Sequence, residues 1–84
     1  MSSISMILYV KAGCPWCPLA EEYLNKHGYK YKRTDVRMDP AAFAELERIS
    51  GQSYVPTLVI GDLVLPDFGL DELEDFLKQH NILP

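Results

Sequence analysis

Apolar and polar positions along the chain predict an alternation of strands and helices. The segment from Ile4 to Val10 is almost continuously apolar and too short for a helix, so it predicts a strand buried on both faces. Further along, Cys17, Ala20 and Leu24 recur at helical spacing and predict a helix with one buried face. Gly28 fits the position just after the end of this helix.

The middle of the chain predicts a strand followed by a second helix. From Tyr29 to Val36 apolar and charged residues roughly alternate, which is typical of a strand with one face in water. Asp39 and Pro40 fit the cap and the first residue of a helix, and Gly51 fits its end. The predicted buried face of this helix consists of Ala42, Phe43, Leu46 and Ile49.

The C-terminal part of the chain predicts a hairpin and a last helix. Two short apolar runs, Thr57–Ile60 and Leu63–Leu65, are joined by Gly61-Asp62, a link typical of a tight antiparallel turn. The last helix is predicted to begin between Asp67 and Gly69 and to end near His80-Asn81. Its predicted buried face consists of Leu70, Leu73, Phe76 and Leu77.

The resulting order is β-α-β-α-β-β-α, which places the chain in the α/β class. We expect a mixed four-stranded sheet flanked by three helices, with the first two strands parallel and joined by a right-handed crossover. Because no linker, repeat or low-complexity stretch interrupts residues 1–84, we expect one domain.

Composition and charge exclude several classes of protein. Hydrophobic residues make up 48% of the 84 residues, which is ordinary for a globular chain and excludes disorder. No run approaches the ~18 apolar residues of a membrane span, and the first residues carry no secretory signal. We therefore expect a cytoplasmic monomer without a membrane partner. The net charge of −4 argues against nucleic acid as a partner. A basic group in the middle of the chain is interpreted as solvated surface, with steering of charged partners as the alternative: Lys26, Lys30, Lys32, Arg33 and Arg37.

The sequence Cys14-Pro15-Trp16-Cys17 lies where the first strand passes into the first helix. A disulfide across so short a loop removes little entropy from the unfolded chain and is therefore a poor structural cross-link. The spacing of the two cysteines points instead to redox chemistry. N–H groups at a helix N-terminus stabilise a thiolate. This predicts Cys14 as the attacking sulfur and Cys17, on the buried helix face, as the resolving sulfur.

Pro18 limits how this helix can begin. If Cys14 caps the helix, Pro18 cannot donate the first backbone hydrogen bond to the Cys14 carbonyl. Either the first turn is opened, or the regular helix begins at Pro18 with Cys17 as its cap. We expect the opened turn, in which the N–H groups of Trp16 and Cys17 still lie near the thiolate.

Two further features leave alternatives open. Zinc normally takes four ligands, and His27 and His80 stand at no recognised spacing from the cysteines, so no metal site is predicted; cysteines in inert positions remain an alternative. Val55-Pro56, directly before the third strand, is either an ordinary start of a strand or a cis peptide bond. A cis bond there would leave the N–H and C=O of Val55 free to pair with an extended thiol peptide.

The stretch Tyr9–Cys17, together with Ser50-Gly51 and Val55-Pro56, resembles the glutaredoxin family of thioredoxin-like proteins over essentially the whole chain. The resemblance implies the thioredoxin-like fold, a cis proline at Pro56 and glutathione-linked reduction of disulfides. It also implies that Lys11 contacts a carboxylate of glutathione and that Trp16 stands against the tripeptide, where the family usually has Tyr or Phe. Val55 would pair with the tripeptide backbone.

One stretch and one single position depart from the family pattern. Pro66-Asp67-Phe68-Gly69 stands where the family commonly has a Gly-Gly pair, a small residue and Asp, at the γ-glutamyl end of glutathione. Phe43 stands where a polar residue usually contacts a carboxylate. The stretch from Gly61 through Phe68 and Asp71 resembles instead the glutaredoxin-like redoxins that serve ribonucleotide reductase and take electrons from thioredoxin reductase.

The leading hypothesis is a thiol-disulfide oxidoreductase that reduces protein or glutathione mixed disulfides through Cys14 and Cys17, with glutathione as reductant and no metal. The first alternative is a redoxin that is reduced by thioredoxin reductase and donates electrons to ribonucleotide reductase or a similar enzyme. A third hypothesis is an iron–sulfur carrier bridged through Cys14 and glutathione, which Pro15 disfavours by stiffening the loop. The fourth is a redox-inactive binding module that keeps the fold as a peptide platform.

Overall fold

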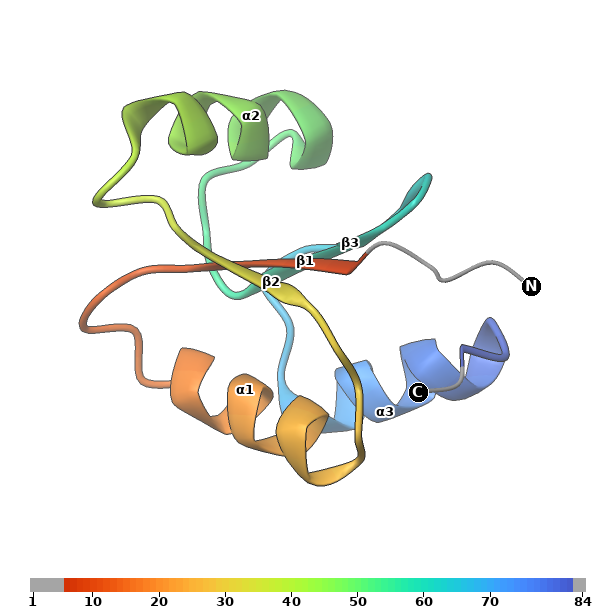
Figure 1. Ribbon diagram of the computed structural model, residues 1–84. Coiled ribbons are helices and arrows are strands. Elements are labelled where there is room, and N and C mark those ends of the chain that lie inside the picture. The colour runs from red at the N-terminus through yellow and green to blue at the C-terminus, as the bar shows by residue number, and fades with distance from the viewer. Residues whose placement is uncertain (1–5, 83–84) are drawn as a thin grey trace.

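The computed structural model describes residues 6–82 and confirms the predicted order of the elements (Figure 1). The strands are β1 (Met6–Val10), β2 (Lys32–Asp35), β3 (Thr57–Ile60) and β4 (Leu63–Leu65). The helices are α1 (Cys17–Lys26), α2 (Pro40–Ser50) and α3 (Leu70–Gln79). Ile4 and Ser5, which the sequence places in the first strand, lie outside the described residues.

Within residues 6–82 the strands form one mixed sheet in the order β2-β1-β3-β4. β1 and β2 run parallel, whereas β3 is antiparallel to both β1 and β4. Helices α1 and α3 cover one face of the sheet and α2 covers the other (Figure 1). This is the sheet between helices that the sequence predicts. No helix in the described part of the chain is long and apolar enough to cross a membrane.

The two faces of the sheet bury different amounts of apolar surface. Because side chains alternate along a strand, β1 sends Leu8 and Val10 to one face and Tyr9 to the other, as predicted for a strand buried on both sides. The α1–α3 face carries the larger cluster, which includes Cys17. The smaller cluster on the α2 face consists of Tyr9, Val36, Leu46 and Val59.

Local signals in the sequence set the ends of α2 and of the hairpin. The Asp39 carboxylate accepts hydrogen bonds from the N–H groups of Ala41 (3.1 Å) and Ala42 (3.3 Å), as a helix cap should. Gly51 ends the helix with a φ of 73°, a conformation that favours glycine. β3 and β4 begin and end where predicted. On α2, however, Leu46 is the buried residue, and the other three predicted members are half-buried.

β2 is shorter than predicted, because Tyr29 bonds back to the end of α1 and does not pair with β1. The N–H of Tyr29 donates to the Leu24 carbonyl (2.9 Å), and its hydroxyl donates to the Ile82 carbonyl (2.7 Å). Pairing with β1 starts only at Lys32. The alternation that includes Tyr29 and Tyr31 therefore reflects packing of two rings against the larger cluster, not a strand face.

α3 begins at Leu70, one residue after the predicted interval, with Gly69 as its cap, and Leu73, Phe76 and Leu77 form its buried face. Leu70, which the sequence places on that face, is 39% exposed instead. As the first residue of the helix it lies at the edge of a shallow groove that Leu19 and Tyr23 of α1 also line.

Candidate active site

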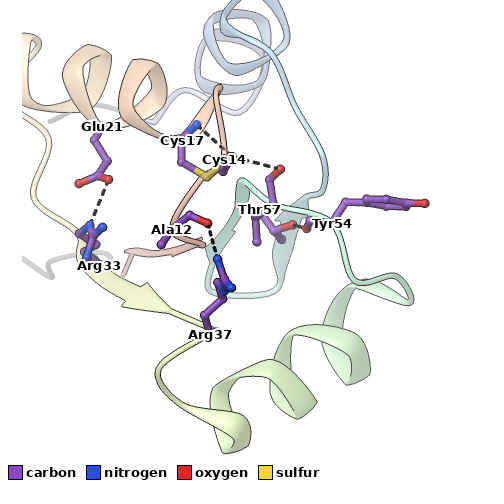
Figure 2. Close-up of a disulfide and its surroundings, with 9 residues drawn as sticks. Ala12, Cys14, Cys17, Glu21, Arg33, Arg37, Tyr54 and Thr57 are labelled. Atoms are coloured by element: carbon purple, nitrogen blue, oxygen red, sulfur yellow. Dashed lines mark hydrogen bonds and ion pairs between the residues drawn. A yellow bond between two sulfur atoms is a disulfide. The ribbon is translucent and has the colours of Figure 1, made fainter.

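Cys14 and Cys17 form a disulfide at the N-terminus of α1, with their Cα atoms 5.5 Å apart (Figure 2). Cys17 is only 3% exposed and packs within the larger cluster, whereas Cys14 is partly buried and packs against that cluster. The N–H of Cys17 donates to the sulfur of Cys14 at 3.2 Å. A backbone N–H in this position also stabilises negative charge on that sulfur once the disulfide is reduced.

α1 starts differently from the expected opened turn at Cys14. Trp16 is its cap and Cys17 its first residue, one position before the start considered in the second alternative. The first helical bond runs from the N–H of Ala20 to the Trp16 carbonyl (3.1 Å). Pro18 is therefore the second helical residue, where no N–H is needed. Of the two N–H groups expected near the sulfur, the structure places that of Cys17 there.

The loop before β3 brings a second segment to the disulfide. The peptide bond between Val55 and Pro56 is cis, as the family resemblance implies. The Val55 carbonyl lies 3.7 Å from the sulfur of Cys14, although the two residues are 41 positions apart in sequence. Among the described residues, the N–H of Val55 has no hydrogen-bond partner. This leaves a short backbone edge open beside the sulfur.

One cleft of about 340 Å³ joins these two segments. Four of the predicted site residues line it, namely Lys11, Cys14, Trp16 and Val55. Pro56 is buried and does not line the cleft. Lys11 is exposed, and the Trp16 side chain is 57% exposed, so an ammonium group and an aromatic ring are both available to a ligand.

Sequence reasoning missed two residues near this cleft. Tyr54 lines it and is 65% exposed, with a ring that points away from the disulfide (Figure 2). Arg37 extends from the end of β2, and its guanidinium donates to the Ala12 carbonyl (3.2 Å) in the loop before Cys14 (Figure 2). The position of Tyr54 beside Val55 was a signal for the first. No local signal marks Arg37, because its partner is 25 residues away.

A second cleft, of about 260 Å³, shares Trp16 with the first. It is lined by Trp16, Asp67, Phe68, Gly69 and Glu72. Phe68 is nevertheless 3% exposed and belongs to the larger cluster, so its side chain packs into the core and anchors the loop before α3 there. Phe43, the other departure from the family pattern, is half-buried against the smaller cluster. Within residues 6–82 no group of three or more metal-ligating side chains is found.

Comparison with known proteins identifies the family. Residues 6–65 match the family model named Glutaredoxin. The chain belongs to the glutaredoxin family. It is 35% identical to a glutaredoxin of Neisseria meningitidis over 60 residues, which are 69% of each chain. Its structure is similar to the thioredoxin-like protein BC3987, with a TM-score of 0.79 and 29% identity over 87% of this chain and 100% of that one.

Glutaredoxins are thiol-disulfide oxidoreductases, so this glutaredoxin-like chain is a thiol redox protein with a Cys-x-x-Cys motif, and the expected thioredoxin-like fold is confirmed. The fold does not select a reductant. A buckwheat glutaredoxin–glutathione complex shares it with a TM-score of 0.70 and 21% identity over 90% of this chain and 71% of that one. The NrdH-redoxin of Escherichia coli, a glutaredoxin-like protein with a thioredoxin-like activity profile, shares it with a TM-score of 0.72 and 22% identity over 95% of this chain and 99% of that one.

Proposed function

We propose that the protein reduces glutathione mixed disulfides and protein disulfides through Cys14 and Cys17, with glutathione as the reductant. The observation that carries this proposal is the single cleft in which Lys11, Cys14, Trp16 and Val55 meet. A cation, a sulfur, an aromatic ring and an open backbone edge are groups that a cysteine-containing tripeptide with free carboxylates can use.

Cys14 is the better candidate for the attacking sulfur, because it is the more exposed of the two and the Cys17 N–H points at it. Its thiolate attacks one sulfur of the substrate disulfide, and the other sulfur leaves as a thiolate. Cys17 then attacks the Cys14 sulfur, which forms the Cys14–Cys17 disulfide and releases the second substrate thiol. One glutathione reopens this disulfide by attack on Cys14, and a second releases glutathione disulfide. The two electrons thus come from two glutathione molecules.

The lining of the cleft supports an orientation for glutathione. The Lys11 ammonium suits a carboxylate, and the exposed face of Trp16 suits the flat tripeptide backbone. The N–H and C=O of Val55 suit two backbone hydrogen bonds beside the sulfur. Asp67 lines the second cleft together with Trp16, and its carboxylate suits an ammonium group.

A second candidate is a redoxin that is reduced by thioredoxin reductase. It is favoured by the two departures from the family pattern, because Phe43 and Phe68 pack against the core and offer no polar group to a tripeptide. A reductase would instead meet the exposed Trp16 and Tyr54 as a protein surface.

Consumption of NADPH during reduction of a small glutathione mixed disulfide separates these candidates. One assay contains glutathione and glutathione reductase, and the other contains thioredoxin reductase alone. We expect turnover in the first. Turnover only in the second assay would indicate that thioredoxin reductase, and not glutathione, is the reductant. No turnover in either assay would favour a redox-inactive binding module.

A matched pair of variants tests the glutathione contact. Lys11→Gln should raise the KM for the glutathione mixed disulfide by roughly two- to fivefold, as expected for loss of one exposed ion pair. Lys30→Gln removes a charge that is also exposed but does not line the cleft, and it should leave the KM unchanged. Equal effects of the two substitutions would contradict the placement of a carboxylate beside Lys11.

A further inference from the structure

The loop that carries Val55 is held by the side chain of Gln52. The amide oxygen of Gln52 accepts a hydrogen bond from the N–H of Tyr54, and its amide nitrogen donates to the Tyr54 carbonyl (3.3 Å). The hydroxyl of Thr57, which is fully buried, donates to the same carbonyl at 2.8 Å. Both polar groups of the residue before Val55 are therefore fixed by side chains.

The same network requires an amide at position 52. The hydroxyl oxygens of Ser50 (2.9 Å) and Thr57 (3.2 Å) also lie within hydrogen-bond distance of the Gln52 nitrogen, so its two N–H groups are shared among three acceptors. These hydroxyls have used their own protons, Ser50 on the Leu46 carbonyl (2.6 Å) and Thr57 on the Tyr54 carbonyl. A side chain that replaces Gln52 must accept on one side and donate on the other, which a carboxylate or a thioether cannot do.

We propose that Gln52 is a positioning residue of the redox centre: by fixing Tyr54 from both sides, it holds the Val55 carbonyl and N–H in place beside the sulfur of Cys14. The inference rests on the proposed function only in taking Cys14 as the attacking sulfur. Gln52 does not line the cleft, and it acts on Cys14 only through Tyr54 and Val55.

This position has two opposite consequences for the reaction. In the reduced protein, the Cys14 thiol can donate to the Val55 carbonyl, which favours the thiol over the thiolate. At the same time, the fixed backbone edge of Val55 favours a substrate that has peptide groups around its disulfide. Releasing the loop should therefore increase the thiolate fraction of Cys14 and weaken its preference for peptide substrates.

The test compares Gln52→Met with Gln79→Met, both in a Cys17→Ser background so that Cys14 is the only thiol. Gln79 is exposed at the end of α3, far from the loop in sequence, and receives the same substitution. The first measurement is the rate of Cys14 alkylation by iodoacetamide at about pH 6, where a peptide cysteine reacts slowly because its pKa is near ~8.5. The second is the rate of attack on oxidised glutathione relative to hydroxyethyl disulfide, which has no peptide group.

In the Gln52→Met variant we expect Cys14 to be alkylated roughly two- to tenfold faster, a factor that corresponds to the free energy of one hydrogen bond. The preference of this variant for oxidised glutathione should fall by a similar factor. Thr57→Val, which removes one of the two donors to the Tyr54 carbonyl, should change both quantities in the same direction by less. It also serves as the test if Gln52→Met does not fold.

Two results would overturn the role of Gln52, and a third would contradict the proposed function. Rates for Gln52→Met equal to those of Gln79→Met would overturn the role of Gln52 and leave the proposed function intact. Slower alkylation together with slower attack on both disulfides would indicate a general loss of structure and would also overturn it. A parent Cys14 that is no more reactive than cysteine in a short peptide would contradict the proposed function itself.

Discussion

The two faces of the sheet hold different parts of the redox centre by different means. On the α1–α3 face, Cys17 is fixed by packing, since its side chain belongs to the larger cluster. On the α2 face, the helix has one buried residue, Leu46, and leads into the loop that carries Val55. That loop is fixed by the hydrogen bonds of Gln52 and Thr57. One side of the disulfide therefore depends on core packing, whereas the other depends on a polar network together with the packing of Val55 against both clusters.

The largest expected effect separates the two sulfurs. Cys14→Ser should bring turnover down to the uncatalysed level, because a serine hydroxyl is a poor nucleophile at neutral pH. Cys17→Ser should keep part of the glutathione-dependent exchange, since Cys14 can still form and release a mixed disulfide. The NADPH-coupled assay with glutathione measures both variants. Full activity of Cys14→Ser would contradict the mechanism.

The next effect compares the stability of the two faces. Leu24 and Leu46 are both fully buried, but Leu46 belongs to the smaller cluster, in which half-buried residues outnumber the four buried ones and can relax around a cavity. Leu24→Ala should therefore lower the free energy of unfolding by an amount near the upper end of the usual range of about 2–5 kcal/mol, and Leu46→Ala by an amount near the lower end. Urea unfolding of both variants measures the difference. Equal losses would show that the two clusters are equally rigid.

A smaller effect concerns the cap of α2. Asp39→Ala removes two hydrogen bonds to the first helical N–H groups and should lower the free energy of unfolding by about 1 kcal/mol. Asp75→Ala replaces an exposed carboxylate within α3 and should change it by less than about 0.5 kcal/mol. The same urea titration compares them. If both variants unfold at the same urea concentration, the cap contributes nothing to the α2 face.

The smallest effect is a dependence on alkaline pH. Burial, together with the nearby Glu45 carboxylate, raises the pKa of Tyr9 in the smaller cluster above its ordinary value of 10.0. The folded protein then holds this proton more tightly than the unfolded chain, so the contribution to stability is complete below pH 10.0 and is lost as the pH rises through the raised pKa. Tyr9→Phe should lose less stability than the parent between about pH 9 and about pH 11. Tyr54→Phe serves as a control at an exposed tyrosine. If Tyr9→Phe leaves the dependence of the free energy of unfolding on pH unchanged, Tyr9 is not the source of the alkaline effect.

Local signals explain what the sequence could predict of the fold. The Gly61-Asp62 turn and the Asp39 cap act on neighbouring residues, so β3, β4 and the start of α2 followed from the sequence. The start of β2 did not, because Tyr29 bonds to Ile82, which is 53 positions away. Alternation alone cannot distinguish a strand from rings that pack against a helix.

The same distinction holds for the site. Lys11, Cys14 and Trp16 are close in sequence, and the structure brings them together with Val55 in one cleft. The burial of Phe68 could not be predicted, since it depends on how the loop before α3 meets the core. Gln52 carries no motif of its own, and the role proposed for it follows only from the four polar groups that lie within hydrogen-bond distance of its amide.

The most direct test of the account is a trapping experiment with the Cys17→Ser protein. The reduced variant is mixed with oxidised glutathione, and peptide mapping by mass spectrometry locates the adduct. The account predicts one glutathione on Cys14 that glutathione in excess removes again, because the Cys14 sulfur lies beside the open backbone edge of Val55. A folded protein whose Cys14 forms no adduct, while the unfolded chain forms one readily, would contradict it.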